Sequence, residues 1–315
     1  MRGDTGAFSH EALLYAGQDE FLAGVVPFLR EGVAFGEPVL VVVSAPRCAV
    51  LREILGADPA GVAFADMAAV GTNPARIIPA WQRFVEGRSD PASPARGIGE
   101  PIFGSRRPAE LVECQQHEAL LNHAFADAGA FRLLCPYDTA ELDTDVIDEA
   151  RRAHPLLRSV GDQPRHSPDF AYAEAGALLS ARLPEPDAAA ETESLTFDAG
   201  CIDAVRRLAE RRAWNAGLSA ERAVDVALAV HELAANSVRH GGGWGRLRIW
   251  SEPSEVVFEV ADRGVVRDPL VGRRAPEPST EGGRGLWLAN QLCDLVQLRS
   301  GPEGTVVRVL MGLAG

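Results

Sequence analysis

The first half of the chain alternates short apolar runs with longer amphipathic ones. The run PVLVVVS, residues 38–44, is unbroken and β-branched, as in a strand buried on both faces. Similar strands are predicted at 12–17, 62–67, 97–103 and 131–138. Helical spacing predicts helices at about 18–32, 46–56, 76–87, 108–125 and 143–154. Five strands that alternate with helices predict a doubly wound α/β domain with a mostly parallel sheet.

The pattern changes after residue 159. The stretch LPEPDAAAETE, residues 183–193, combines prolines, acids and small residues, which is typical of a linker. We therefore predict a first domain at 1–160, a connecting segment at 161–193 and a second domain at 194–315.

The second domain has a different order of elements. After a short strand at 195–198, helices are predicted at 202–217 and 220–240, and Ser219 is placed to cap the second of them. Strands are then predicted at 245–251 and 255–262, a helix at 285–295, and a hairpin at 296–300 and 305–311. Helices followed by antiparallel strands predict a two-layer α/β sandwich.

Charge and composition exclude some classes of function. The 315 residues carry a formal net charge of −13 and include no Lys, so all basic side chains are Arg. Nucleic acid is not expected as a partner, because binding to a phosphate backbone needs a basic surface. A P-loop of the type that ends in Gly-Lys-Ser/Thr is also excluded, since that motif requires its Lys.

The cysteines and the apolar runs indicate the cellular compartment in which the protein is expected. Cys48, Cys114, Cys135, Cys201 and Cys293 are odd in number and never in Cys-x-x-Cys spacing, which indicates a reducing compartment and gives no zinc or disulfide signal. The sequence has no signal-peptide pattern at its start and no apolar run of about 18 residues. We expect a cytoplasmic protein that does not enter a membrane.

Three segments of the second domain carry candidate chemistry. In AVHELAANSVRHGGG, residues 229–243, Glu232 and Asn236 are one helical turn apart on one face, which is also common on a solvated helix. In VADRGVV, Asp262 ends a strand where its carboxylate can accept an amine, and Gly264 lets a base approach the backbone. EGGRGLWLAN places glycines at a helix start, which favours phosphate, after a long loop at 265–282 that we interpret as a lid.

The order of these segments, followed by GTVVRV at 304–309, resembles the N, G1 and G2 boxes of the GHKL (Bergerat-fold) ATPases. The resemblance covers residues 195–313 and is greatest to the short domains of anti-sigma-factor serine/threonine kinases. It implies that Asn236 binds Mg²⁺, that Glu232 acts as catalytic base and that Asp262 reads adenine. The ATP-binding residues implied are Asn236, Asp262, Gly264, Gly283, Arg284, Gly285, Leu286 and Thr305. One departure is Val266, which stands where the family has the second Gly of its Asp-x-Gly-x-Gly box.

The resemblance implies an anti-anti-sigma (STAS-type) protein as the phosphorylated partner, or a sigma factor as a sequestered one. Two alternatives stay open: an ATP-gated binding adaptor without kinase activity, and a histidine kinase that uses His231 or His154. A homodimer is also compatible with the sequence.

The first domain resembles the methanogen/methylotroph sensory (MEDS) domain over residues 8–158, on the motifs HEALLYAG, RGIGEPIF, HEALLN and LLCPYD. This resemblance implies that it senses a small-molecule signal. Polar residues near strand ends suggest a sensory pocket formed by His10, Glu100, Glu118 and Asp138, because ligands bind beyond the carboxyl ends of parallel strands. Alternatively, these carboxylates cap helices or pair with Arg96, Arg106 and Arg107. His10, His117 and His123 lack the close spacing of a metal site, and none is predicted from them.

Overall fold

The computed structural model describes residues 7–56, 60–88, 90, 93–188, 190–276 and 284–313. The chain forms two compact units, Met1–Ala173 and Glu174–Gly315. Across the described ranges, no helix combines the length and the apolar character needed to cross a membrane.

The first unit is built around one seven-stranded sheet. Its strands are β1 (Ser9–Tyr15), β2 (Val39–Val43), β3 (Val62–Asp66), β4 (Ala95–Gly99), β5 (Phe131–Asp138), β6 (Leu156–Ser159) and β7 (Arg165–His166). Its helices are α1 (Gly17–Phe35), α2 (Ala45–Leu55), α3 (Met67–Val70), α4 (Ile77–Glu86), α5 (Pro108–Ala124) and α6 (Thr144–Ala153), with a 3-10 turn η1 (Pro74–Arg76).

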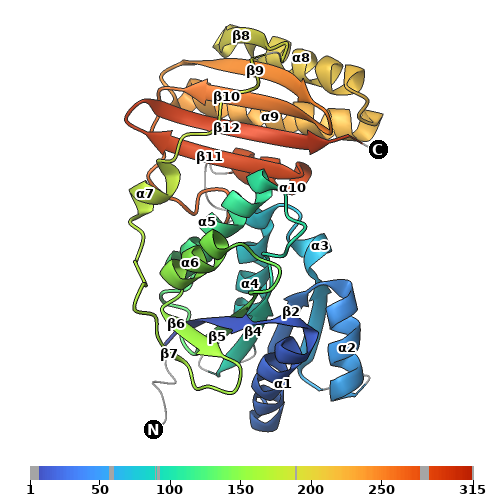
Figure 1. The fold of residues 1–315 in the computed structure, drawn as a ribbon. Helices are drawn as coiled ribbons and strands as arrows, with labels where there is room; N and C mark the ends of the chain where they lie inside the picture. The colour runs from blue at the N-terminus through green and yellow to red at the C-terminus, as the bar shows by residue number, and fades with distance from the viewer. Residues whose placement is uncertain are drawn as a thin grey trace. The chain divides into compact units, whose positions relative to one another are not determined.

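The strands lie in the order β3-β2-β4-β5-β1-β6-β7 (Figure 1). Every neighbouring pair is parallel except β6 and β7, which are antiparallel. The predicted mostly parallel sheet is therefore confirmed. The structure adds β6 and β7, two short edge strands that follow the point where the sequence pattern weakens.

Both faces of this sheet are packed. On one face, side chains such as Leu13 of β1 and Leu134 of β5 join a core with α1 and α2. On the other face, the ring of Trp81 of α4 packs against β4. A Cβ atom on Gly97 or Gly99 would come within 2.9 Å of the Trp81 ring. The glycines of β4 are thus explained by the room that the indole needs.

The second unit is a five-stranded sheet with helices packed on it. Its strands are β8 (Glu193–Asp198), β9 (Trp244–Glu252), β10 (Glu255–Asp262), β11 (Leu295–Gly301) and β12 (Gly304–Gly312). Its helices are α7 (Ala175–Leu179), α8 (Ile202–Asn215), α9 (Ala220–His240) and α10 (Arg284–Leu292), with a 3-10 turn η2 (Ala199–Cys201). The strand order is β11-β12-β10-β9-β8, and each neighbouring pair is antiparallel. The predicted two-layer α/β sandwich is confirmed.

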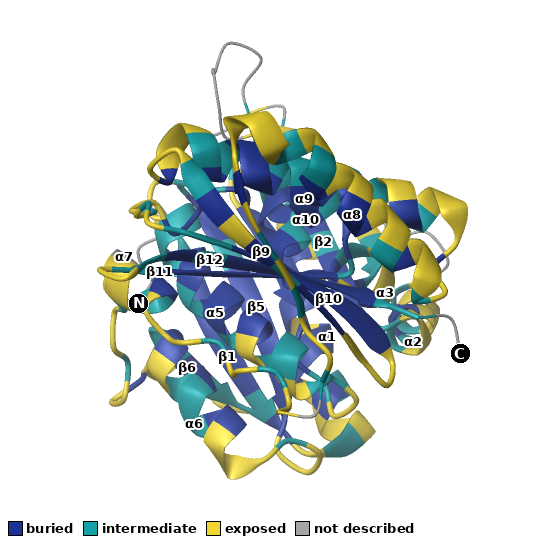
Figure 2. Ribbon diagram, turned by 90° about the horizontal axis from the view of Figure 1, so that it is seen from above, coloured by how far each residue is buried: buried dark blue, intermediate teal, exposed yellow. Residues whose placement is uncertain are grey.

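The two faces of this sheet differ in chemistry. Phe258 of β10 belongs to the core shared with α8, α9 and α10, and Figure 2 shows β10 mostly in the buried colour. On the opposite face, the carboxylate of Glu259 lies 2.7 Å from Nη2 of Arg308 and 3.5 Å from Nη1 of Arg248. Both guanidinium groups lie over the ring of Trp250. The buried charges of Glu259 and Arg308 are therefore paired with each other.

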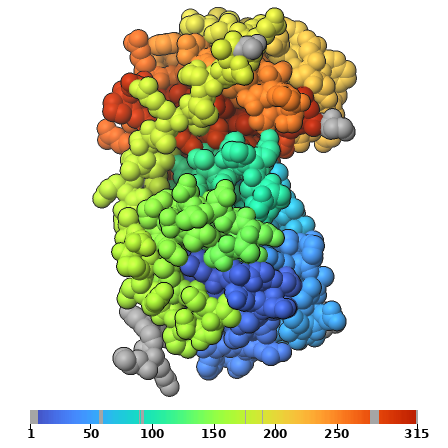
Figure 3. Space-filling view, viewed as in Figure 1, coloured from blue at the N-terminus to red at the C-terminus, as the bar shows by residue number. Residues whose placement is uncertain are grey.

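The segment before β8 packs on the second unit. Leu179 is buried in the core of that unit. The carbonyl of Pro184 accepts a hydrogen bond from Arg308 at 2.9 Å, and Glu185 pairs with Arg248 at 2.9 Å. Figure 3 shows this segment on the surface of the unit, in yellow-green. Within the segment 161–193, these residues are held by side-chain contacts.

Helix α9 begins with the predicted cap. The Ser219 side chain accepts a hydrogen bond from the backbone N–H of Arg222 at 3.3 Å. We expect Ser219→Ala to lower the free energy of unfolding of the second unit by about 1 kcal/mol, because an orphan N–H loses its acceptor. Ser219→Gly should cost only a few tenths, since Gly is tolerated at this position. Urea denaturation of both variants measures the difference; equal losses would contradict a capping role.

Candidate functional site

Helix α9 presents two polar side chains that make no hydrogen bond or ion pair with the part of the chain that the structure describes. Glu232 and Asn236 are four residues apart and half-buried, on the same side of the helix. No hydrogen bond or ion pair from the described residues reaches the Glu232 carboxylate or the Asn236 amide. Both groups are therefore available to a ligand.

The start of α10 lies directly against these two side chains. A Cβ atom on Gly285 would come within 2.9 Å of Nδ2 of Asn236 and within 3.1 Å of Oε2 of Glu232. The first N–H groups of a helix have no intrahelical partner, and the helix dipole favours an anion there. The structure thus brings Glu232, Asn236, Arg284, Gly285 and the buried Leu286 together at one helix end. Gly283 lies outside the described residues.

Asp262 ends β10 beside the carboxyl end of α9. Its Oδ1 accepts a hydrogen bond from the backbone N–H of Gly264 at 2.7 Å, and its Oδ2 lies 2.6 Å from Oγ of Ser237. Each carboxylate oxygen can accept a second hydrogen bond, so the group still has acceptor capacity for an exocyclic amine. Sequence reasoning missed Ser237, although it directly follows Asn236.

Two glycines allow this close approach. A Cβ atom on Gly264 would come within 2.7 Å of the His240 carbonyl, and one on Gly241 would come within 2.3 Å of Cγ of Asp262. Arg263 N–H also donates to the Gly241 carbonyl at 3.2 Å. Gly264 therefore allows the end of α9 to approach closely, and its predicted role, to let a base approach the backbone, stays a prediction.

A chain of hydroxyl groups holds the loop after β10. The N–H of Val266 donates to Ser300 Oγ at 2.8 Å, and Ser300 Oγ lies 2.8 Å from Thr305 Oγ1. Thr305 in turn donates to the Gly264 carbonyl at 2.8 Å. Thr305 therefore supports the loop, and its predicted role as a hydroxyl beside the base stays a prediction. Ser300 was not predicted.

The first part of the segment interpreted as a lid is anchored. Leu270 is buried, and the amide of Asn290 donates to the Gly272 carbonyl at 2.9 Å. Gly272 has φ +73°, and a Cβ atom there would come within 2.6 Å of Leu286. Because Leu286 and Asn290 belong to α10, the loop is held against this helix by one hydrogen bond and by packing of Gly272 on Leu286.

The predicted sensory-pocket residues separate into two places in the first unit. Glu100 and Asp138 lie at strand ends, and Arg47 pairs with Glu100 and lies 3.8 Å from Asp138. Tyr15 donates to Glu100 at 2.9 Å, and burial raises the pKa of Tyr15 to about 12. These carboxylates do pair with an arginine, but it is Arg47 from α2 and not one of the three considered from the sequence.

His10 and Glu118 lie elsewhere, between the sheet and α5. Nε2 of His10 lies 3.1 Å from Oε2 of Glu118, and both residues are buried. Burial lowers the pKa of His10 to about 4, so its ring is neutral at pH 7. His154 lies at the C-cap of α6, and its Nε2 lies 3.2 Å from Oε2 of Glu118.

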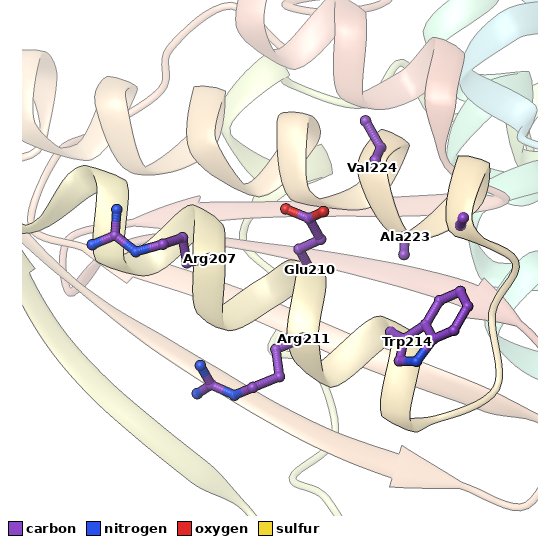
Figure 4. A pocket seen from close by; sticks show the side chains of 7 residues that line it. Arg207, Glu210, Arg211, Trp214, Ala223 and Val224 are labelled. Carbon is purple, nitrogen blue, oxygen red and sulfur yellow. The ribbon is translucent and has the colours of Figure 1, made fainter.

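A surface groove between α8 and α9 is separate from these sites. Figure 4 shows the side chains that line the groove, among them Arg207, Glu210, Arg211 and Trp214 of α8 and Val224 of α9. None of the residues that line the groove is a predicted nucleotide ligand. The chemistry of the second unit is therefore concentrated at α9, α10 and the end of β10.

Comparison with known families finds a different family in each of the two units. Residues 9–155 match the family described as MEthanogen/methylotroph, DcmR Sensory domain (MEDS). Residues 195–311 match the histidine kinase-like ATPase domain. Both resemblances drawn from the sequence are confirmed. No curated protein matches the chain.

Among solved structures, the chain is similar to a crystal structure of the RsbU and RsbW domains of Rv1364c from Mycobacterium tuberculosis. The sequences are 17% identical, and the TM-score is 0.29. The match covers 38% of this chain and 31% of that one, so it spans about a third of each.

Proposed function

Because the chain joins a MEDS domain to a histidine kinase-like ATPase domain, we propose that it is a signalling regulator whose second unit binds Mg-ATP under the control of a sensory first unit. An ATPase domain of this type implies ATP binding. The finer output is phosphorylation of Ser or Thr on an anti-anti-sigma (STAS-type) partner, or sequestration of a sigma factor.

The observation that carries this proposal is the contact of Gly285 with Asn236 and Glu232. The segment with Glu232 and Asn236 and the segment with Gly285 are distant in the sequence, and they meet at the start of α10. The amide and the carboxylate have no partner among the described residues, and they lie at the helix end that would bind phosphate. On an amphipathic helix whose polar face is only solvated, these two groups would point into solvent and not toward the start of a second helix. Phosphoryl transfer depends on such positioning and on charge neutralisation more than on covalent chemistry.

The residues present fit Mg-ATP. The Asn236 side-chain oxygen is a hard ligand of the kind that Mg²⁺ takes, and the ion would neutralise charge on the phosphates. Asp262 would accept the adenine amine, while Ser237 and the Gly264 N–H hold the carboxylate in place. The N–H groups at the start of α10 would receive phosphate oxygens. Glu232 would orient or deprotonate the attacking seryl hydroxyl or a water.

Val266 supports the second candidate, an ATP-gated adaptor without kinase activity. Its side chain packs against the core of the second unit, and its N–H is held by Ser300. The loop that a glycine would leave free to bend is thereby fixed. In the adaptor, ATP binds as described and Glu232 performs no proton transfer.

Calorimetric titration of Mg-ATP into the full chain tests nucleotide binding. We expect Asp262→Asn to weaken binding at least about tenfold, because the amide presents a donor toward the adenine amine. Asn236→Ala should remove the dependence of affinity on Mg²⁺. Asp203→Asn and Asn215→Ala, both exposed on α8, are matched controls that should bind like the wild type. Absence of wild-type binding at millimolar ATP would overturn the proposal.

A further inference from the structure

Four side chains with metal-binding atoms meet between the sheet and the helices of the first unit. His10 lies on β1, Cys135 on the neighbouring strand β5, Glu118 on α5, and His154 directly after α6 (Figure 1). One ligand atom from each lies within 4.8 Å of the other three, and all four residues are buried. The proposed function of the second unit does not use this cluster.

The surroundings of His10 determine which ring nitrogen carries the proton. Nδ1 of His10 lies 3.2 Å from Oδ1 of Asn122, and the Asn122 amide is oriented because its Nδ2 donates to the Ala153 carbonyl at 2.8 Å. Nδ1 must therefore donate, and a neutral ring presents a lone pair at Nε2. That lone pair faces Oε2 of Glu118 at 3.1 Å.

His154 is oriented in a similar way. Its Nδ1 lies 2.7 Å from the Ala150 carbonyl, so this nitrogen also carries a proton. Its Nε2 has no hydrogen-bond partner among the described residues, yet it lies 3.2 Å from the same Oε2 of Glu118. The Nε2 atoms of two imidazole rings thus face one carboxylate oxygen, and buried acceptors without donors are strongly unfavourable.

While both rings are neutral, the thiol of Cys135 is the one nearby proton donor in the described part of the chain. The Cys135 Sγ lies 3.4 Å from Nε2 of His10, and its single proton can satisfy only one acceptor. Protonation of both rings would place two positive charges in a buried site with ring centroids 4.0 Å apart. The other carboxylate oxygen of Glu118 is also buried, and no hydrogen bond from the described residues reaches it.

We propose that His10, Glu118, Cys135 and His154 bind a Zn²⁺ ion. Two imidazoles, a thiolate and a carboxylate are the ligands that Zn²⁺ takes, and tetrahedral bond lengths separate such ligand atoms by about 3.3–3.6 Å. The contacts of 3.1, 3.2 and 3.4 Å are close to that spacing. Nitrogen and sulfur donors select Zn²⁺ over Mg²⁺ or Ca²⁺.

The outer partners of the two histidines fit the same conclusion. In metal sites a ligating His donates its other N–H to a carbonyl or carboxylate, which fixes its orientation. The Asn122 and Ala150 oxygens occupy these positions for His10 and His154. Binding displaces the thiol proton of Cys135. The ion then joins β1, β5, α5 and the end of α6, the elements around the MEDS core.

Metal analysis of the full chain, purified with a histidine-free tag from zinc-supplemented cells, tests the site. We expect about one zinc per chain in the wild type, and at least about a tenfold loss in Cys135→Ala and His154→Gln. Cys114→Ala is the matched control, because this buried cysteine contacts the Pro101 carbonyl and lies outside the cluster. Full zinc content in Cys135→Ala, or a folded wild type without zinc after refolding in its presence, would overturn the proposal.

If circular dichroism shows that the variants do not fold, a second measurement on the wild-type protein tests the site. Wild-type protein refolded with Co²⁺ should show the d–d absorption of a tetrahedral ion and a near-ultraviolet thiolate-to-metal band. A folded, Co²⁺-loaded wild type without the thiolate band would refute ligation by Cys135. ATP titration of the zinc-free protein separates this result from nucleotide binding by the second unit.

Discussion

Glu232→Gln is expected to lower ATP hydrolysis at least about 100-fold, because a positioned general base typically contributes a factor of that size or larger. Gln keeps the size of the side chain but cannot take a proton. The Glu232 carboxylate is half-buried and free of hydrogen bonds and ion pairs from the described residues. Since the proposed role of Glu232 is to act on the attacking group and not on the nucleotide, ATP affinity should stay close to that of the wild type.

Release of labelled phosphate under single-turnover conditions measures this effect without knowledge of the protein partner. Glu221→Gln is the matched control, because Glu221 is exposed in the first turn of the same helix. We expect no change in that variant. If the wild type binds ATP and turns it over no faster than Glu232→Gln does, the adaptor function is correct and the kinase function is not.

Much of the second unit was predictable because its chemistry is local in sequence. Glu232 and Asn236 share a helix face through four-residue spacing, and Asp262 ends an alternating strand. Ser237 and Ser300 were not predicted. A serine within a helix or strand has no pattern of its own, and the contacts that matter here are with partners 25 and 34 residues away, Asp262 and Val266.

In the first unit, two short strands and the proposed metal-binding cluster were not predictable from the sequence. Its sheet followed from apolar periodicity, but β6 and β7 are too short to have a period. A zinc site was not predictable from the sequence, because the cluster takes His10, Glu118, Cys135 and His154 from positions spread over the domain. His117 and His123, which look like companions of His10, lie outside it. Only the register of β1 with β5 places His10 and Cys135 on one face.

Gly285→Ala is expected to weaken Mg-ATP binding at least about tenfold without loss of stability. The new Cβ atom would lie 2.9 Å from Nδ2 of Asn236 and 3.1 Å from Oε2 of Glu232. Both atoms end flexible side chains, so the protein relieves the contact by turning these side chains away. Gly285 has no positive φ, and Ala is the better helix former, so α10 itself should tolerate the change.

A fall in affinity that accompanies an unchanged or higher melting temperature therefore assigns the effect to displaced ligands and not to unfolding. Gly176→Ala is the control, because Gly176 is also helical and a Cβ atom there would meet no atom within 4 Å. It should leave affinity unchanged. Calorimetry on Gly285→Ala that gives wild-type affinity would mean that phosphates do not bind where α10 begins, and Asn236 would then lose its assigned role, because no other described helix start contacts it.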